Sequence, residues 1–148
     1  MRRRNYENFD PVGLVMPILS SLFGLIIVLL IIFLLYLFNL LIHTNLVTGI
    51  IDFLFKNIAL IFVLSVCFSF GVYLSKHGAP VNAAAPLITS IGAILLVFFI
   101  VSMLNMILPN QSGVGPIIDM IQTHMLWIFG ILLAVGYLAY FIKLTNRD

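Results

Sequence analysis

The sequence predicts an all-α membrane protein with four transmembrane helices, formed by a tandemly duplicated helical hairpin. Three observations support this fold class. First, 63% of the 148 residues are hydrophobic and only 8% are charged, whereas a soluble domain carries about 25% charged residues. Second, the apolar residues gather in long runs, and about 20 consecutive apolar residues suffice for a helix to cross a bilayer. Third, a pattern of prolines and hydroxyl residues occurs twice, and such self-similarity predicts a structural repeat.

Four apolar runs, at residues 14–42, 53–74, 87–108 and 125–142, mark the expected spans. The fourth span is expected to begin earlier than its run and to cover approximately residues 117–142. The first run is about twice as long as the apolar core of a signal peptide and lacks a small-residue cleavage site, so we expect a retained helix. The remaining segments are a basic tail at 1–9, short loops and a second tail at 144–148. These segments leave no stretch for a soluble domain.

The distribution of lysine and arginine predicts the orientation. Cations flank the spans on one side, at Arg2, Arg3, Arg4, Lys76, Lys143 and Arg147, whereas the loops at 43–52 and 109–124 contain none. Because cytoplasmic segments are enriched in lysine and arginine, we expect a multi-pass protein of the cell membrane with both termini in the cytoplasm. The net charge of +2 reflects this asymmetry. Membrane lipids with anionic headgroups are sufficient partners for these cations, and no nucleic acid is implied.

Residues 10–76 and 79–143 resemble two copies of one hairpin. At an offset of 69, the aligned pairs are Pro11 and Pro80, Pro17 and Pro86, Ser20 and Thr89, and Ser21 and Ser90. At an offset of 67, IIDFLFKNIALIF from Ile50 resembles IIDMIQTHMLWIF from Ile117. Chance similarity between two apolar segments is the alternative. Since each copy holds two spans, both copies enter the membrane in the same direction, and we expect a pseudo-two-fold axis along the membrane normal to relate them.

The repeated prolines predict helix starts, because an amide in the first helical turn has no partner within the helix. Pro11 and Pro80 are expected to begin short lead-in segments, and Pro17 and Pro86 to open the membrane-embedded helices.

Small residues spaced four apart predict the helix contacts, since they allow two backbones to approach closely in lipid. These pairs are Ser20 and Gly24, Thr89 and Ala93, Ser65 and Ser69, Cys67 and Gly71, and Gly130 and Ala134. The hydroxyl residues Ser20, Ser21, Thr89 and Ser90 are also candidates for a polar pathway. Hydroxyls in membrane helices more often bond to their own backbone or to a neighbouring helix.

Two acidic residues, Asp52 and Asp119, are expected in the first turns of the second and fourth spans. An acidic residue in that position interacts favourably with the helix dipole. In an oligomer the same carboxylates would form a ring at a pore entrance that favours cations. The sequence leaves both interpretations open.

No pattern in the sequence predicts catalysis. Single histidines at the ends of the spans do not make a metal site, and one cysteine cannot form an intramolecular disulfide. We therefore expect no enzyme, no cofactor and no metal. The expected function is a non-enzymatic integral membrane subunit that acts by helix packing, as a self-assembled homo-oligomer or as a structural or accessory component with other membrane-protein subunits. The alternative is an oligomeric channel or small transporter that conducts cations.

Overall fold

The computed structural model describes residues 11–77, 80–108 and 115–145. The arginines at 2–4 and at 147 and the side chain of Pro11 lie outside the described residues. The described chain is helical and contains no strand. Its long helices are α1 (Val15–Ile42), α3 (Ile58–Lys76), α4 (Ala85–Ile107) and α6 (Met125–Thr145). All four are long and apolar enough to cross a membrane, which confirms the predicted all-helical class and gives four candidate spans.

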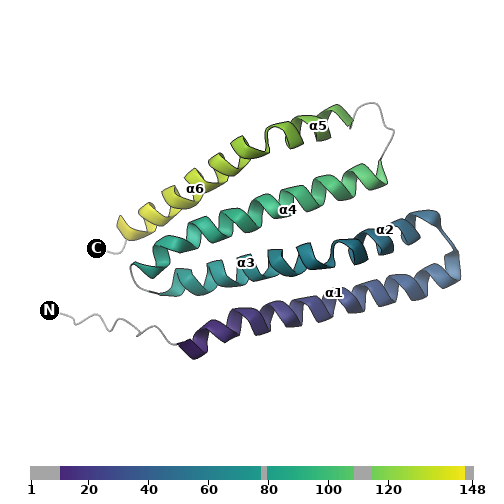
Figure 1. Cartoon of the computed structure of the whole chain (residues 1–148), viewed down its shortest axis with the longest axis horizontal. Coiled ribbons are helices and arrows are strands. Elements are labelled where there is room, and N and C mark those ends of the chain that lie inside the picture. The colour runs from purple at the N-terminus through teal and green to yellow at the C-terminus, as the bar shows by residue number, and fades with distance from the viewer. Residues whose placement is uncertain (1–10, 78–79, 109–114, 146–148) are drawn as a thin grey trace.

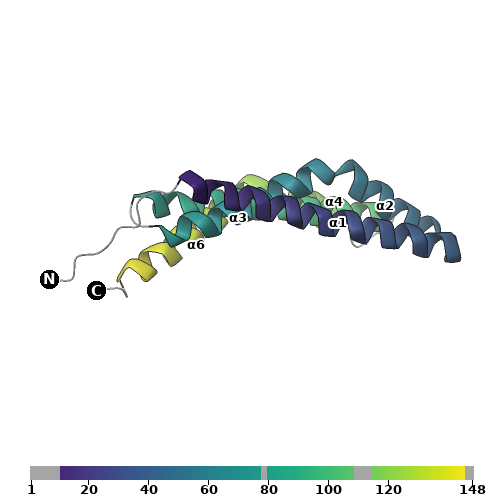
Figure 2. The ribbon, with the colours of Figure 1, turned by 90° about the horizontal axis from the view of Figure 1, so that it is seen from below.

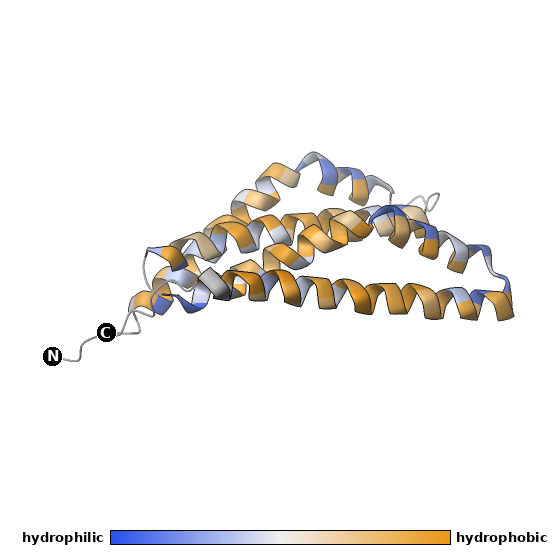
Figure 3. Ribbon diagram, turned by 60° about the horizontal axis from the view of Figure 1, so that its bottom comes forward, coloured by the Kyte–Doolittle hydropathy of each residue, from blue (hydrophilic) through white to orange (hydrophobic). Residues whose placement is uncertain are grey.

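The four long helices lie side by side in the order α1, α3, α4, α6 (Figure 1). Seen from below, they form a single layer (Figure 2). The most extensive contact is between α3 and α4, and α1 and α6 pack on the outer sides of this central pair. The polar residues gather at the two ends of the layer and the apolar residues between them (Figure 3). The row is open, because no other element among the described residues covers its two broad faces or its two outer edges.

Two short helices, α2 (Asn45–Lys56) and α5 (Gly115–Thr123), precede α3 and α6. They lie at one end of the row, here called the distal end, whereas α1 begins and α6 ends at the opposite, proximal end (Figure 1). The second and fourth transmembrane helices therefore begin at Ile58 and Met125, later than the predicted residues 53 and 117. The predicted loop at 43–52 is mostly helical.

The boundary between each short helix and the following long one is a single residue, Asn57 or His124. The Asn57 side-chain amide donates to the carbonyl oxygen of Phe53 at 2.8 Å, and His124 Nδ1 lies 2.9 Å from the carbonyl oxygen of Met120. The backbone N–H groups of both residues donate to the same two carbonyls, at 3.0 and 3.1 Å. The chain thus changes direction while the backbone N–H group of each boundary residue stays paired. Polar residues mark both breaks in the sequence, at Lys56–Asn57 and Thr123–His124.

Two pairs of small residues on α3 explain why the helices form a row. Ser65 and Ser69 lie on the side of α1, whereas Cys67 and Gly71 lie on the side of α4. A shift of two residues corresponds to a rotation of about 200° around an α-helix. The two pairs thus mark nearly opposite faces, and helices that pack on opposite faces of α3 extend a layer.

The two halves of the chain have the same order of elements, each with a 3₁₀ turn, a long helix, a short helix and a second long helix. The 3₁₀ turns are Pro11–Leu14 and Val81–Ala84. A two-fold axis through the middle of the row would exchange α3 with α4 and α1 with α6, but the sequence pattern pairs α1 with α4 and α3 with α6. The expected pseudo-two-fold relation therefore does not fit. The order of the row instead places the helices of each aligned pair two positions apart.

Candidate functional site

The contact between α1 and α3 is built on four of the predicted small residues. Ser21 is completely buried, with 0% exposure. Its hydroxyl donates to the carbonyl oxygen of Pro17 at 2.8 Å and lies 3.2 Å from Ser69 Oγ. One turn further along, a Cβ placed on Gly24 would lie 3.3 Å from Ser65 Oγ. The neighbouring Ser20 is exposed, so Ser21 rather than Ser20 pairs with Gly24 in this contact.

The α3–α4 interface is closest at Gly71 and Gly92. A Cβ on Gly71 would overlap with Thr89 Oγ1, and a Cβ on Gly92 would lie 3.1 Å from Cys67 Cβ. The Thr89 hydroxyl donates to the carbonyl oxygen of Ala85 at 2.8 Å, as expected for a hydroxyl that bonds to its own helix. Gly92 was not among the predicted contact residues, although its position one turn after Thr89 is a usable signal.

The contact between α4 and α6 uses Gly136, which the sequence analysis also missed. A Cβ on Gly136 would lie 3.4 Å from Pro86 Cβ and 3.5 Å from Ser90 Oγ. Ser90 is buried and Ala93 is half-buried. Gly136 aligns with Ser69 at the offset of 67, and this alignment is the signal that would have identified it.

The predicted pair Gly130 and Ala134 makes no such contact within the chain. Both residues are exposed, and no atom lies within 4 Å of a Cβ placed on Gly130. They lie on the outward face of α6, because α6 stands at the edge of the row and has a neighbouring long helix on one side alone. Within residues 11–77, 80–108 and 115–145, this small-residue face of α6 thus has no partner.

Asp52 and Asp119 are exposed at the distal end, on α2 and α5. No acidic residue lies in the first turn of these two helices or of α3 and α6. The prediction that both acids open a transmembrane helix is therefore wrong, because the short helices begin before them and the long helices begin after them. The helix-dipole explanation is removed, whereas a role at a pore entrance is not tested.

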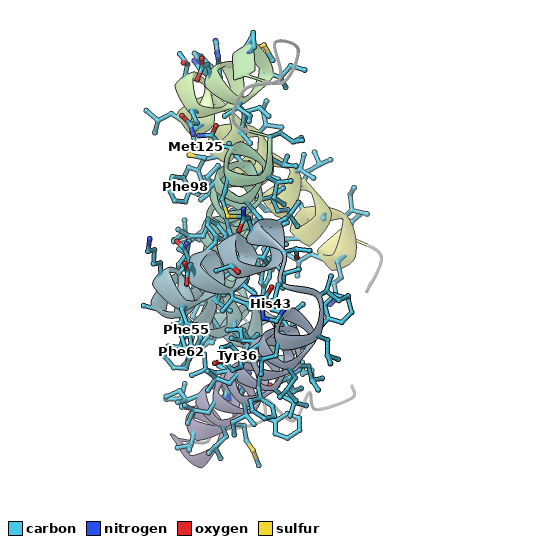
Figure 4. The ribbon with its side chains drawn as sticks, turned by 90° about the vertical axis from the view of Figure 1, so that its right-hand side faces the viewer. Tyr36, His43, Phe55, Phe62, Phe98 and Met125 are labelled. Atoms are coloured by element: carbon cyan, nitrogen blue, oxygen red, sulfur yellow. The ribbon has the colours of Figure 1, made fainter. Side chains whose placement is uncertain are left out.

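The turn between α1 and α2 is held by Asn39. Its side-chain amide donates to Thr48 Oγ1 at 2.9 Å, and its Oδ1 accepts from the backbone N–H of Thr44 at 3.2 Å. His43, labelled in Figure 4, ends α1 in a left-handed conformation with φ of 51°, and its N–H donates to the carbonyl oxygen of Asn39 at 2.8 Å. Asn39 therefore stabilises the turn between α1 and α2 locally.

Two pockets open at the proximal end of the row. The α1–α3 pocket has a volume of about 380 Å³, and the α4–α6 pocket, to which α3 also contributes, has a volume of about 270 Å³. The linings share a proline, a hydroxyl residue, a small residue, a tyrosine and a lysine at aligned positions. These pairs are Pro17 and Pro86, Ser20 and Thr89, Ser69 and Gly136, Tyr73 and Tyr140, and Lys76 and Lys143.

One buried amide distinguishes the α4–α6 pocket. Asn82 lines this pocket and is only 6% exposed. Its Oδ1 accepts a hydrogen bond from the Tyr140 hydroxyl at 3.0 Å. At the aligned position in the first half the residue is Gly13, which packs directly against the ring of Tyr73, since a Cβ there would lie 2.9 Å from the Tyr73 hydroxyl oxygen. The two pockets therefore share a lysine and a tyrosine but differ in one strong hydrogen-bonding group.

No family model, no curated protein and no solved structure matches this chain. Within the part of the chain that the structure describes, no three histidine, cysteine or acidic side chains gather where they could hold a metal ion. The function is therefore inferred from the open row, its edges and its two pockets.

Proposed function

We propose that the protein is a non-enzymatic integral membrane subunit that assembles with copies of itself, the outer face of α6 packing on the outer face of α1 in the next copy. In this proposal the two halves are duplicated hairpins and both termini lie in the cytoplasm. The observation that carries the proposal is the open row, whose two edges expose the residues that align with the α3–α4 interface.

The duplication is supported by contacts that recur at aligned positions. The buried contact of Ser21 with Ser69 aligns with the contact of Ser90 with Gly136. The packing of Tyr73 on the first 3₁₀ turn aligns with the hydrogen bond between Tyr140 and the second one. Chance similarity between apolar helices gives no reason for tertiary contacts to recur in this way.

The outer face of α6 corresponds to the face of α3 that packs on α4. The α3 residues Cys67 and Gly71 align with Ala134 and Leu138. Ala134 is exposed and Leu138 is 64% exposed. The face that α3 buries against α4 thus has a counterpart on α6 that no part of the described chain covers.

The outer face of α1 corresponds in the same way to the face of α4 that packs on α3. Thr89 and Gly92 align with Ser20, which is exposed, and with Phe23, which is 65% exposed. By alignment, Leu138 of one copy would meet Ser20 of the next, and Ala134 would meet Phe23. Each pair combines a small and a larger side chain, as Gly71 and Thr89 do within the chain, so the volumes of the edges are complementary.

Such an interface joins two different surfaces, and its repetition gives a ring if the rotation closes and a continuous strip if it does not. A shift by the two positions that separate the helices of each aligned pair is the same kind of operation. The pattern α1, α3, α4, α6 would therefore continue into the next copy with little change, and packing of small residues would hold the helices together in lipid, where the hydrophobic effect between them is absent.

Disulfide cross-linking tests this interface. A Cβ on Gly71 would lie 3.4 Å from Thr89 Cβ, close to the distance of about 3.5–4.5 Å that a disulfide requires. The variant with Leu138→Cys and Ser20→Cys, in a Cys67→Ala background, is expected to form a ladder of linked multimers when native membranes are oxidised.

The matched control replaces Ser20→Cys by Leu22→Cys, which lies at nearly the same depth but about 200° around the helix. If the Ser20→Cys variant forms no more disulfide-linked multimers than this control, the proposed interface is rejected. Native mass spectrometry of gently extracted protein distinguishes a self-assembled homo-oligomer from an accessory subunit of another complex. One homo-oligomeric mass is expected, whereas a second polypeptide in every particle would make the protein an accessory subunit of a different complex.

The alternative function is a cation channel. Asp52 and Asp119 are both exposed at the distal end, so a closed ring would bring carboxylates from every copy to one mouth, and such rings favour cations. Changing both to asparagine is expected to lower the permeability of cations relative to anions in planar bilayers. Unchanged permeability ratios would remove this role.

A further inference from the structure

We infer that the α4–α6 pocket binds the phosphate group of an anionic phospholipid in the leaflet at the proximal end of the row. This site lies away from the outer edges of α1 and α6, so it does not depend on the proposed assembly. Three features of the pocket carry the inference: a buried amide with a free donor, a single positive charge and walls that suit an acyl chain.

The buried amide is Asn82. Its Oδ1 is engaged by the Tyr140 hydroxyl at 3.0 Å, and among the described residues its Nδ2 has no hydrogen-bond partner. Nδ2 is not fully enclosed, because Thr44 Oγ1 is the one fully buried unpaired side-chain atom among the described residues, so this donor is accessible from the pocket. Because Asn82 lines the pocket, a ligand oxygen inside the pocket would satisfy this donor. Tyr140 fixes the orientation of the amide.

The charge comes from Lys143, which is the only charged residue among those that line the pocket. Lys143 lies in the last turn of α6, at the depth where a lysine meets lipid headgroups. An ammonium group binds phosphate as a point charge, and no acidic side chain in the lining competes for it. The electrostatics of the pocket therefore favour an anion.

The size and the walls favour a lipid over a free anion. The volume of about 270 Å³ equals that of roughly nine waters at about 30 Å³ each, which is enough for a phosphate and its glycerol ester. Val72, Pro86 and Leu144 form apolar walls beside the polar group. A free phosphate would leave these walls in contact with water, whereas the first part of an acyl chain would cover them.

The α1–α3 pocket provides an internal comparison. It contains Lys76 and Tyr73 at aligned positions, but Gly13 replaces the buried amide. A lipid held only by a lysine at the interface exchanges readily with its neighbours. Retention of a lipid is therefore expected at the α4–α6 pocket and not at the α1–α3 pocket.

The test measures lipid retention by native mass spectrometry after exchange into nanodiscs that contain phosphatidylglycerol and phosphatidylcholine in equal amounts. We expect one phosphatidylglycerol per chain to survive release from the nanodisc. Lys143→Gln and Asn82→Ala should each weaken retention about tenfold, since a charge-assisted hydrogen bond contributes about 1.5–3 kcal/mol. Lys76→Gln should leave retention unchanged.

Each alternative has its own outcome. If Lys76→Gln and Lys143→Gln reduce the retention of phosphatidylglycerol equally, the specific site is overturned. The lipid would then be held by the general attraction of anionic lipids to cations. Equal retention of phosphatidylcholine would overturn the anion preference. If millimolar inorganic phosphate displaces the bound phosphatidylglycerol, the ligand is a free anion and the lipid is rejected. Lys143 is exposed, so its substitution tests the site even if Asn82→Ala fails to fold.

Discussion

The α3–α4 interface makes a sharp prediction about Gly71. Alanine at this position would place its Cβ on Thr89 Oγ1, where the two atoms overlap. Neither helix can easily give way, because the Thr89 hydroxyl is held by the carbonyl oxygen of Ala85 at 2.8 Å and this interface is the most extensive in the chain. Gly71→Ala is therefore expected to force α3 and α4 apart or to turn the threonine side chain.

The size of the effect follows from the nature of the contact. Forcing an additional methyl group into a packed interface costs about 1–3 kcal/mol, and a loss of one or two kcal/mol changes the ratio of folded to unfolded protein by about 5–30-fold. The overlap involves one oxygen atom, since the next atom, Thr89 Cβ, would lie 3.4 Å away. Thr89→Ala removes that oxygen and should restore most of the lost stability in the double variant.

Unfolding of the monomer in mixed micelles with increasing denaturing detergent, followed by helical circular dichroism, measures these differences. The control is Gly130→Ala, because no atom lies within 4 Å of its new Cβ and it should change the free energy of unfolding very little. A Gly71→Ala variant as stable as this control would refute the packing described for α3 and α4. A double variant no more stable than Gly71→Ala would show that Thr89 is not the residue it meets.

Two further substitutions test single hydrogen bonds in the same unfolding assay. Ser21→Ala should destabilise the chain by about 1 kcal/mol, because it removes the buried link to the neighbouring helix, whereas Ser20→Ala at the adjacent exposed position should have no measurable effect on the monomer; equal effects would contradict the placement of Ser21. Tyr140→Phe should cost about 1 kcal/mol through loss of its bond to the second 3₁₀ turn, with exposed Tyr36→Phe as the control, and an unchanged midpoint would show that this bond contributes nothing to stability.

The sequence was sufficient to predict the four long helices and several of their contacts, but not the short helices α2 and α5. Apolar runs of sufficient length define the spans, and the spacing of Ser65 and Ser69 relative to Cys67 and Gly71 holds the information that α3 packs on two sides. The rule that small residues lie at contacts has a limit, because it identifies faces that permit close approach and not the neighbour that uses them. Gly130 and Gly136 illustrate this limit. Both are small residues on α6, and their spacing alone does not show that Gly136 is the one that faces α4.

The buried amide could not be predicted in the same way. Asn82 lies in a short segment of small residues and prolines, where an exposed turn residue would be expected. Its burial depends on Tyr140, which is 58 residues away in the chain. The helix breaks at Asn57 and His124 were missed for a different reason. Polar residues interrupt the apolar pattern there, at Lys56–Asn57 and Thr123–His124. They were included in one continuous helix each, so the acids before them were assigned to the wrong helices.

The length of α1 has a consequence for the surrounding bilayer. With 28 residues, α1 is about 42 Å long at 1.5 Å per residue, whereas the hydrocarbon core is about 30 Å thick. The 21 residues of α6 give about 32 Å, which matches that thickness. The helix at one edge of the row is therefore longer than the hydrocarbon core is thick, whereas the helix at the other edge matches it. Each ångström of mismatch costs a fraction of a kcal/mol, through tilting of the helix or stretching of the lipids. Covering the α1 edge with the next copy would relieve part of this mismatch, so thinner membranes should favour association.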